Sequence, residues 1–194
     1  MPGYTCRQAL TLSRRVRELW SPDLLLIYSL HSDARRAHER DLLFLGTGTG
    51  PLAHTGLARL TTHAALWLRS RTGSARTSLT DYRTCLAAMT ADQRQYGGRA
   101  VFVTPISRTN LDDQAPAPDD LLVGPAPYED AMAAVAAETD SPHIDLPAAV
   151  GSICPDCGEA LLMDEVHPTA NGLAIMASVI AREIDDGGLL TRAD

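Results

Sequence analysis

A carboxylate and a histidine at catalytic spacing lie near the end of this 194-residue sequence. Asp164 precedes His167 by three residues, and Pro168 follows where a helix is predicted to begin. In such a loop the carboxylate can hold one imidazole nitrogen, which leaves the other to act as a general base. A bare Asp-x-x-His favours a plainer interpretation, a helix cap beside a surface histidine. The full stretch 163–172, followed by apolar residues at helical spacing, is much more specific.

The four cysteines do not strongly indicate a metal, redox or catalytic site. Cys154 and Cys157 make one Cys-x-x-Cys, whereas a structural zinc needs four ligands. Structural thiols or a local disulfide are therefore favoured over a metal or a redox pair, and we predict no metal site. Four cysteines and no visible signal peptide favour reduced thiols in a cytoplasmic protein. Cys6 lies early in a predicted helix, where a thiolate would be favoured, but a small packing residue is the preferred interpretation.

Composition sets the class of protein. Hydrophobic residues make up 45% of the chain, so we predict one globular domain spanning residues 1–194 rather than a disordered chain. The formal net charge of -7 disfavours a general nucleic-acid binder. No apolar run approaches the roughly 20 residues that span a bilayer. The expected partner is a small molecule or a protein.

The elements that would position these residues alternate between helices and short apolar strands. Such alternation predicts an α/β domain with a parallel sheet. The strand at 24–28 is continuously apolar, so we expect it to be buried on both faces. Residues 46–50 lack the Lys-Ser/Thr of a phosphate loop and are interpreted as a flexible loop. The predicted helices are 5–20, 35–45, 57–68, 79–95, 128–138 and 169–185, the strands 24–28, 99–105 and 143–146, and the irregular segments 110–127 and 147–165.

Three motifs resemble those of the SGNH (GDSL-type) esterases and lipases. Residues 164–168 with Asn171 and Gly172 resemble the last motif of that family. Residues 2–5, ahead of a helix, resemble its second motif, and residues 30–33 resemble its Gly-x-Asn-Asp motif. The resemblance implies a flavodoxin-like three-layer α/β/α fold. It also implies ester hydrolysis by a Ser-His-Asp mechanism on a small-molecule ester, without a cofactor.

The resemblance assigns roles to four residues. His167 is the base and Asp164 its partner, while the Gly3 backbone N–H and the Ser32 side chain take the places of oxyanion-hole donors. Ser32 stands where the family has Asn, and Leu30 stands where it has Gly. The family nucleophile is a Ser in a Gly-Asp-Ser motif after the first strand. This sequence has no Gly-Asp-Ser, so the nucleophile is unassigned and we expect that strand to be missing.

Three hypotheses follow from these departures. In the first, the chain is an ester hydrolase whose gene model starts too late, so that this version is inactive. In the second, it is a non-catalytic binding module or degenerate protein of the same fold. In the third, a partner chain or a second copy covers the unpaired sheet edges and supplies the strand. The acyl and alcohol groups of the substrate are not specified by these motifs.

Overall fold

The computed structural model describes residues 4–35, 64, 75–111, 126–155 and 157–190. Several expectations lie outside these residues: the helices predicted near 35–45 and 57–68, the loop at 46–50, and most of the segment 110–127. Gly3 also lies outside the described residues. Within them the chain runs through α1 (Cys6–Trp20), β1 (Leu24–Ile27), α2 (His31–Ala34), α4 (Leu79–Gln95), β2 (Arg99–Val103), α5 (Arg108–Leu111), α6 (Ala126–Glu138), β3 (His143–Ile144), α7 (Leu146–Ile153), α8 (Gly158–Leu161) and α9 (Ala170–Asp186).

The long helices and the strands agree with the sequence to within a few residues. The segment 147–165, which was expected to be irregular, instead contains α7 and α8. The Asp145 side chain accepts a hydrogen bond from the Ala148 N–H at 3.1 Å, and Pro147 occupies the first turn of α7. Both features favour a helix start. The third strand therefore ends at Ile144 rather than at Leu146.

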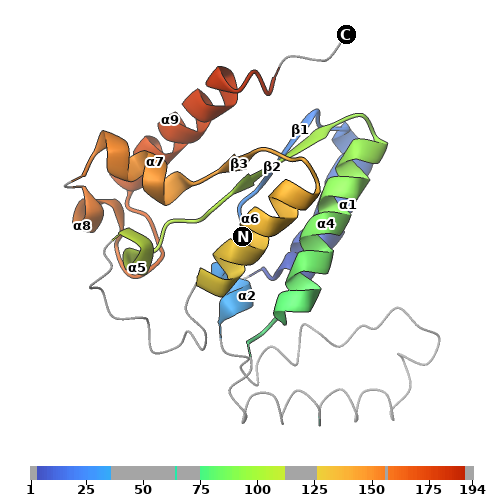
Figure 1. The fold of residues 1–194 in the computed structure, drawn as a ribbon, viewed down its shortest axis with the longest axis horizontal. Helices are drawn as coiled ribbons and strands as arrows, with labels where there is room; N and C mark the ends of the chain where they lie inside the picture. Colours follow the sequence, from blue (N-terminus) through green and yellow to red (C-terminus); the bar gives the residue numbers. More distant parts are fainter. Residues whose placement is uncertain (1–3, 36–63, 65–74, 112–125, 156, 191–194) are drawn as a thin grey trace.

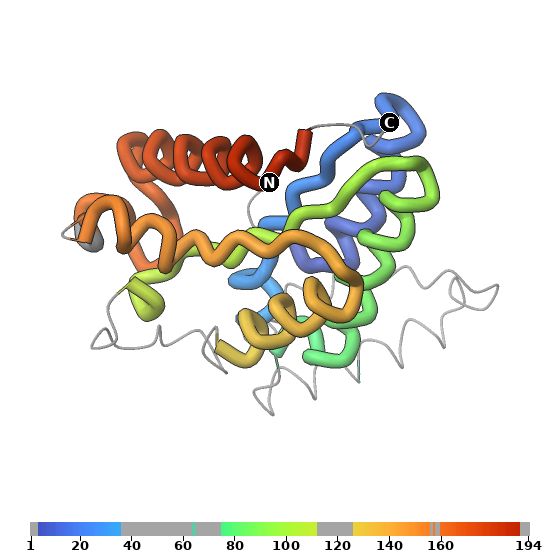
Figure 2. Tube along the Cα trace, turned by 45° about the horizontal axis from the view of Figure 1, so that its top comes forward, coloured from blue at the N-terminus to red at the C-terminus, as the bar shows by residue number. Residues whose placement is uncertain are grey.

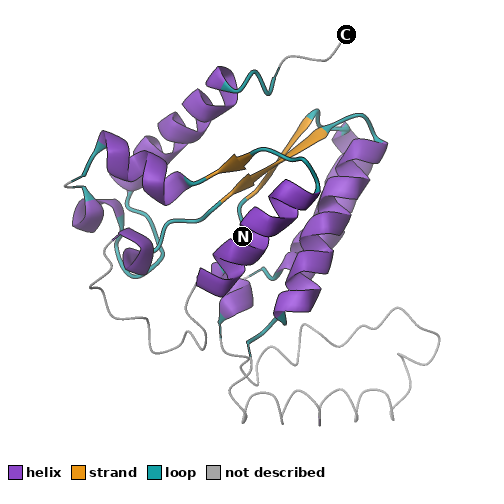
Figure 3. Ribbon diagram, in the orientation of Figure 1, coloured by secondary structure: helices purple, strands orange, loops and turns teal. Residues whose placement is uncertain are grey.

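The described strands form one parallel sheet in the order β1-β2-β3. Leu24 lies opposite Arg99 in the first pair, and Phe102 lies opposite His143 in the second. Helices cover both faces, with α1, α4 and α6 on one and α7 and α9 on the other (Figure 1). Figure 3 shows the strands running between these two groups of helices. The predicted three-layer α/β/α arrangement is confirmed.

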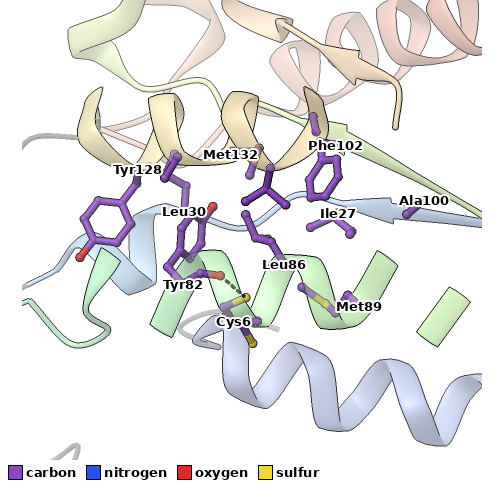
Figure 4. Packing of buried hydrophobic residues seen from close by; sticks show 14 of the residues in the cluster. Cys6, Ile27, Leu30, Tyr82, Leu86, Met89, Ala100, Phe102, Tyr128 and Met132 are labelled. Atoms are coloured by element: carbon purple, nitrogen blue, oxygen red, sulfur yellow. Dashed lines mark hydrogen bonds between the residues drawn. The ribbon is translucent and has the colours of Figure 1, made fainter. Parts of the chain in front are cut away.

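Two apolar clusters hold the layers together. The first packs the α1, α4 and α6 side of the sheet, and in it Tyr82 and Tyr128 meet edge to face with ring centroids 5.2 Å apart (Figure 4). The second packs α7, α8 and α9 against β2 and β3 and includes Leu161 and Leu162. The end of α8 is therefore anchored in the core on the opposite side of the sheet.

The outer edge of β1 is more exposed than expected. Leu25 and Ile27 pack into the first cluster, but Leu26 is 43% exposed. Within the described residues β1 pairs only with β2, so it forms an edge of the described sheet. Successive side chains of a strand alternate between its two faces, so Leu26 points away from the first cluster and is exposed on the opposite face. The expectation that residues 24–28 are buried on both faces is therefore wrong.

Candidate active site

The segment 162–168, called the base loop below, connects α8 to α9. Leu162 and Pro168 form an antiparallel bridge across it, and the Met163 N–H donates to the His167 carbonyl oxygen at 2.7 Å. The loop is thus a short hairpin whose two ends are paired. This pairing fixes the backbone on which Asp164 and His167 stand.

Asp164 holds His167 at both its backbone and its side chain. Asp164 Oδ1 accepts the backbone N–H groups of Val166 and His167 at 3.0 and 2.8 Å, and Oδ2 lies 2.7 Å from His167 Nδ1. The two backbone N–H groups, and then the imidazole, lower the pKa of Asp164 to about 2. An ionised carboxylate only accepts hydrogen bonds, so Nδ1 carries the proton and Nε2 of the neutral ring carries a lone pair. Nε2 is therefore the atom that can act as a base.

The first turn of α9 is packed directly on the end of α8. Thr169 Oγ1 accepts the Gly172 N–H at 2.9 Å, which caps α9, and donates to the Ala160 carbonyl oxygen at 2.9 Å. A Cβ at Gly172 would lie 2.1 Å from the Leu161 carbonyl oxygen, so only glycine permits this approach. These contacts fix the direction in which the chain leaves His167.

The loop that follows β2 connects the base loop to α2. The Arg108 N–H donates to the Glu165 carbonyl oxygen at 2.9 Å, and the His31 ring lies 3.1 Å from the Ile106 carbonyl oxygen through Nε2. A carbonyl only accepts, so His31 Nε2 carries its ring proton. The pKa of His31 is lowered to about 4, chiefly by burial and to a smaller extent by the charges of Arg35 and His167, against the hydrogen bond to the Ile106 carbonyl oxygen, which raises it. The segment that carries Ser32 is therefore linked to the base loop and lies within electrostatic reach of His167.

Asp33 ties the segment around Ser32 to the start of α1. Its carboxylate accepts the Cys6 N–H at 2.9 and 3.1 Å, the Thr77 hydroxyl at 2.6 Å and the Ser29 hydroxyl at 3.1 Å. Asp33 is fully buried, and this burial raises its pKa against the effect of those donors. Asp33 is the last residue of the motif at 30–33, and the sequence alone predicted no role for it. The signal available in the sequence was a carboxylate shortly after the end of the predicted strand 24–28.

The other predicted site residues have different outcomes. Ser32 lies in α2 and is half-buried, and its role as an oxyanion donor stays a prediction. Gly3 stays a prediction because it lies outside the described residues. Cys6 is fully buried, and Figure 4 shows its sulfur facing the Tyr82 carbonyl oxygen at 3.9 Å. A hydrogen bond with Cys85, followed by burial, raises the pKa of the Cys6 thiol, so the packing interpretation is supported over a nucleophile.

Cys154 and Cys157 form a disulfide, and Cys6 and Cys85 are free and buried. The general expectation of reduced cysteines is therefore confirmed for Cys6 and Cys85 and wrong for Cys154 and Cys157, for which a local disulfide was one of the two favoured alternatives. The Cα atoms of Cys154 and Cys157 are 5.3 Å apart, because the turn between α7 and α8 brings them together. Among the described residues, no group of three or more His, Cys, Asp or Glu side chains is arranged to hold a metal ion.

Comparisons with known proteins find similarity only at the level of structure. No family model and no curated protein matches the sequence. A lipase/acylhydrolase from Enterococcus faecalis superposes with a TM-score of 0.58 at 18% identity, covering 100% of this chain and 76% of its own. An acetylxylan esterase from Geobacillus stearothermophilus gives 0.61 at 19%, covering 94% and 68%. A putative GDSL-like lipase from Parabacteroides merdae gives 0.58 at 15%, covering 96% and 70%.

The chain has the SGNH/GDSL-type hydrolase fold. Within this fold, the Asp164–His167 pair lies just before α9, where the sequence motif predicted it. None of the described helices is both long and apolar enough to cross a membrane.

Proposed function

We propose that this chain carries the acid–base part of an ester hydrolase site. The observation that carries the proposal is the 2.7 Å contact between Asp164 Oδ2 and His167 Nδ1, in a fold shared with lipase and esterase structures. Asp164 orients the ring and stabilises the imidazolium that forms during the reaction. Nε2 is left to take a proton from a nucleophile.

The reaction is an acyl transfer in two steps. In the first step, His167 Nε2 takes the proton of a serine hydroxyl while the oxygen attacks the ester carbonyl. The alcohol then leaves with that proton. In the second step, a water molecule loses a proton to His167 and attacks the carbonyl of the acyl-serine. The bond to the serine oxygen breaks, the acid is released, and His167 returns the proton to the serine. Gly3 and Ser32 are the proposed donors to the oxyanion, and a Ser hydroxyl reaches less far than the carboxamide whose place it takes.

The nucleophile of this mechanism is unassigned, because no serine of this sequence lies in a Gly-Asp-Ser motif. We propose that a further strand, pairing with the open edge of β1, brings it to the site. The support is the edge itself, which has no partner beyond β2 among the described strands. A segment encoded directly upstream, a second copy and another protein are the candidate sources of this strand.

The decisive experiment compares two versions of the protein. The first is this chain alone, and the second is the chain extended by any in-frame codons directly upstream of Met1. Nitrophenol release from short-chain nitrophenyl esters is measured for each, with His167→Ala as the control. We expect negligible turnover by the chain alone and His167-dependent turnover by an extended form that contains Gly-Asp-Ser. Robust turnover by the chain alone that survives His167→Ala would overturn the proposal.

A second candidate function is a non-catalytic binding module of the same fold. It is favoured by the replacements at Leu30 and Ser32 and by the lack of Gly-Asp-Ser in the sequence. Leu30 is 2% exposed, so it serves as a core residue. A stop codon directly upstream, together with ester binding but no turnover in solution, would favour this function over hydrolysis.

A further inference from the structure

The Cys154–Cys157 disulfide lies at the junction between α7 and α8. Cys154 is the C-cap residue directly after α7, and its N–H donates to the Val150 carbonyl oxygen at 2.9 Å. Cys157 is the N-cap residue directly before α8, and its carbonyl oxygen accepts the N–H groups of Ala160 and Leu161 at 2.9 and 3.1 Å. The bond therefore joins the residue that caps the end of one helix to the residue that caps the start of the next.

The second of these helices is the support on which the base loop stands. α8 is only four residues long, so its own hydrogen bonds stabilise it weakly. It is fixed at its end by the burial of Leu161 and by the Thr169 N–H, which donates to the Leu161 carbonyl oxygen at 2.8 Å. At its start it is held by the disulfide and by the Cys157 N–H, which donates to the Cys154 carbonyl oxygen at 3.1 Å. Leu162, the next residue, opens the base loop that carries Asp164 and His167.

The disulfide is also placed where a reductant can reach it. Cys154 and Cys157 are half-buried and Pro155 between them is exposed, whereas the free thiols Cys6 and Cys85 are buried on the other side of the sheet. A dithiol reagent would therefore act on this bond without a competing disulfide in the chain. A partly exposed disulfide in a short loop is open to thiolate attack.

We propose that Cys154–Cys157 is a thiol–disulfide switch that controls how firmly the base loop holds His167. In the reducing step a thiolate of a dithiol attacks one sulfur, and its second thiolate then resolves the mixed disulfide. The S–S bond of the protein breaks, two cysteine thiols form, and the dithiol leaves as a disulfide, having supplied two electrons and two protons. Reduction frees the start of α8, and the base loop then opens locally more often. The effect on catalysis rests on the proposed function, but the effect on the loop does not.

Hydrogen exchange of backbone amides tests the switch without any enzyme assay. The oxidised chain is compared with the chain treated with dithiothreitol, and exchange is followed at the amides of Met163 and Thr169. Because a cross-link closing a very short ring limits the open states, we expect exchange at both amides to speed up about tenfold on reduction. The reference is the Phe102 amide, which donates to the Pro142 carbonyl oxygen at 2.9 Å within the sheet and should not change.

A matched variant separates reduction from other effects of the reagent. The double variant Cys154→Ser/Cys157→Ser should exchange as the reduced chain does and should not respond to dithiothreitol. Unchanged exchange at Met163 and Thr169 after verified reduction overturns the switch. Equal acceleration at Phe102 also overturns it, because the bond would then be a staple of the whole fold. Failure to find esterase activity leaves all of these outcomes unaffected.

Discussion

Asp164 holds His167 through both of its carboxylate oxygens, one on the backbone N–H at 2.8 Å and one on ring Nδ1 at 2.7 Å. The contact with the backbone N–H fixes the position of the His167 backbone, and the contact with Nδ1 fixes the orientation of its imidazole ring. Because both side chains are about half exposed, water competes for these bonds. The arrangement therefore depends on the carboxylate remaining ionised.

The first prediction concerns the pH range over which this contact persists. The pKa of Asp164 falls from an ordinary 3.8 to about 2 in the folded chain, chiefly through the N–H groups of Val166 and His167. Since the folded-state pKa is the lower one, the stabilisation is fully present above about pH 4 and is lost as the pH falls through about 2. An NMR titration of the Asp164 carboxyl carbon should show its midpoint near the lower value. A midpoint at or above 3.8 would contradict the contact.

The second prediction concerns the close packing of α9 on α8. Gly172→Ala should lower the free energy of unfolding by about 1–3 kcal/mol, because the added methyl group meets the Leu161 carbonyl oxygen. Helix propensity alone predicts the opposite, a gain of about 1 kcal/mol. The matched control is Asn171→Ala, at the exposed neighbouring position, which should be neutral or slightly stabilising. Urea unfolding of the two variants decides between the effects, and a stabilised Gly172→Ala protein would refute the packing.

The sequence predicted most of the fold and part of the site. The helices α4 and α9 and the strand β2 have strong apolar patterns and clear end signals, and the Asp164–His167 contact lies within one local motif. Contacts between distant segments left no such signal. The link from Asp33 to Cys6 spans 27 residues, and the link from Arg108 to Glu165 depends on how two loops meet in the folded chain.

The exposure of Leu26 and the helices at 147–165 were missed for different reasons. Apolar runs do not distinguish a central strand from an edge strand, since that depends on what lies beside it. The start of α7 depends on one capping hydrogen bond, which the Asp145 side chain accepts. In the sequence, Asp145 directly follows the residues of β3 and was included in the predicted strand 143–146. The disulfide forms because the turn between α7 and α8 brings the two cysteines together. The spacing of the cysteines in the sequence does not specify the geometry of that turn.

The third prediction tests whether the edge of β1 is open in solution. Figure 2 shows β1, in blue, at the margin of the central strands. Leu26→Ala in the isolated chain should cost less than about 1 kcal/mol, because the side chain is already 43% exposed. Phe102→Ala, in the fully buried centre of the sheet, should cost about 3–5 kcal/mol.

Both variants are measured by urea unfolding at low and high protein concentration. A cost for Leu26→Ala near that of Phe102→Ala would show that the face of β1 on which Leu26 lies is covered in solution. A cost for Leu26→Ala that grows with protein concentration would identify a second copy of the chain as the cover. A small, concentration-independent cost is the expected result.

The last prediction concerns Ser32 in any form of the protein that shows His167-dependent esterase activity. A donor to the oxyanion acts on the transition state, so changing it should alter kcat more than KM. We expect Ser32→Asn to raise kcat by up to about 10², because a carboxamide reaches further than a hydroxyl. Ser32→Ala should lower kcat, and thermal unfolding of both variants provides the check on folding. If Ser32→Ala leaves kcat unchanged in a folded protein, Ser32 is not an oxyanion donor, and the place of the second donor must be sought elsewhere in the site.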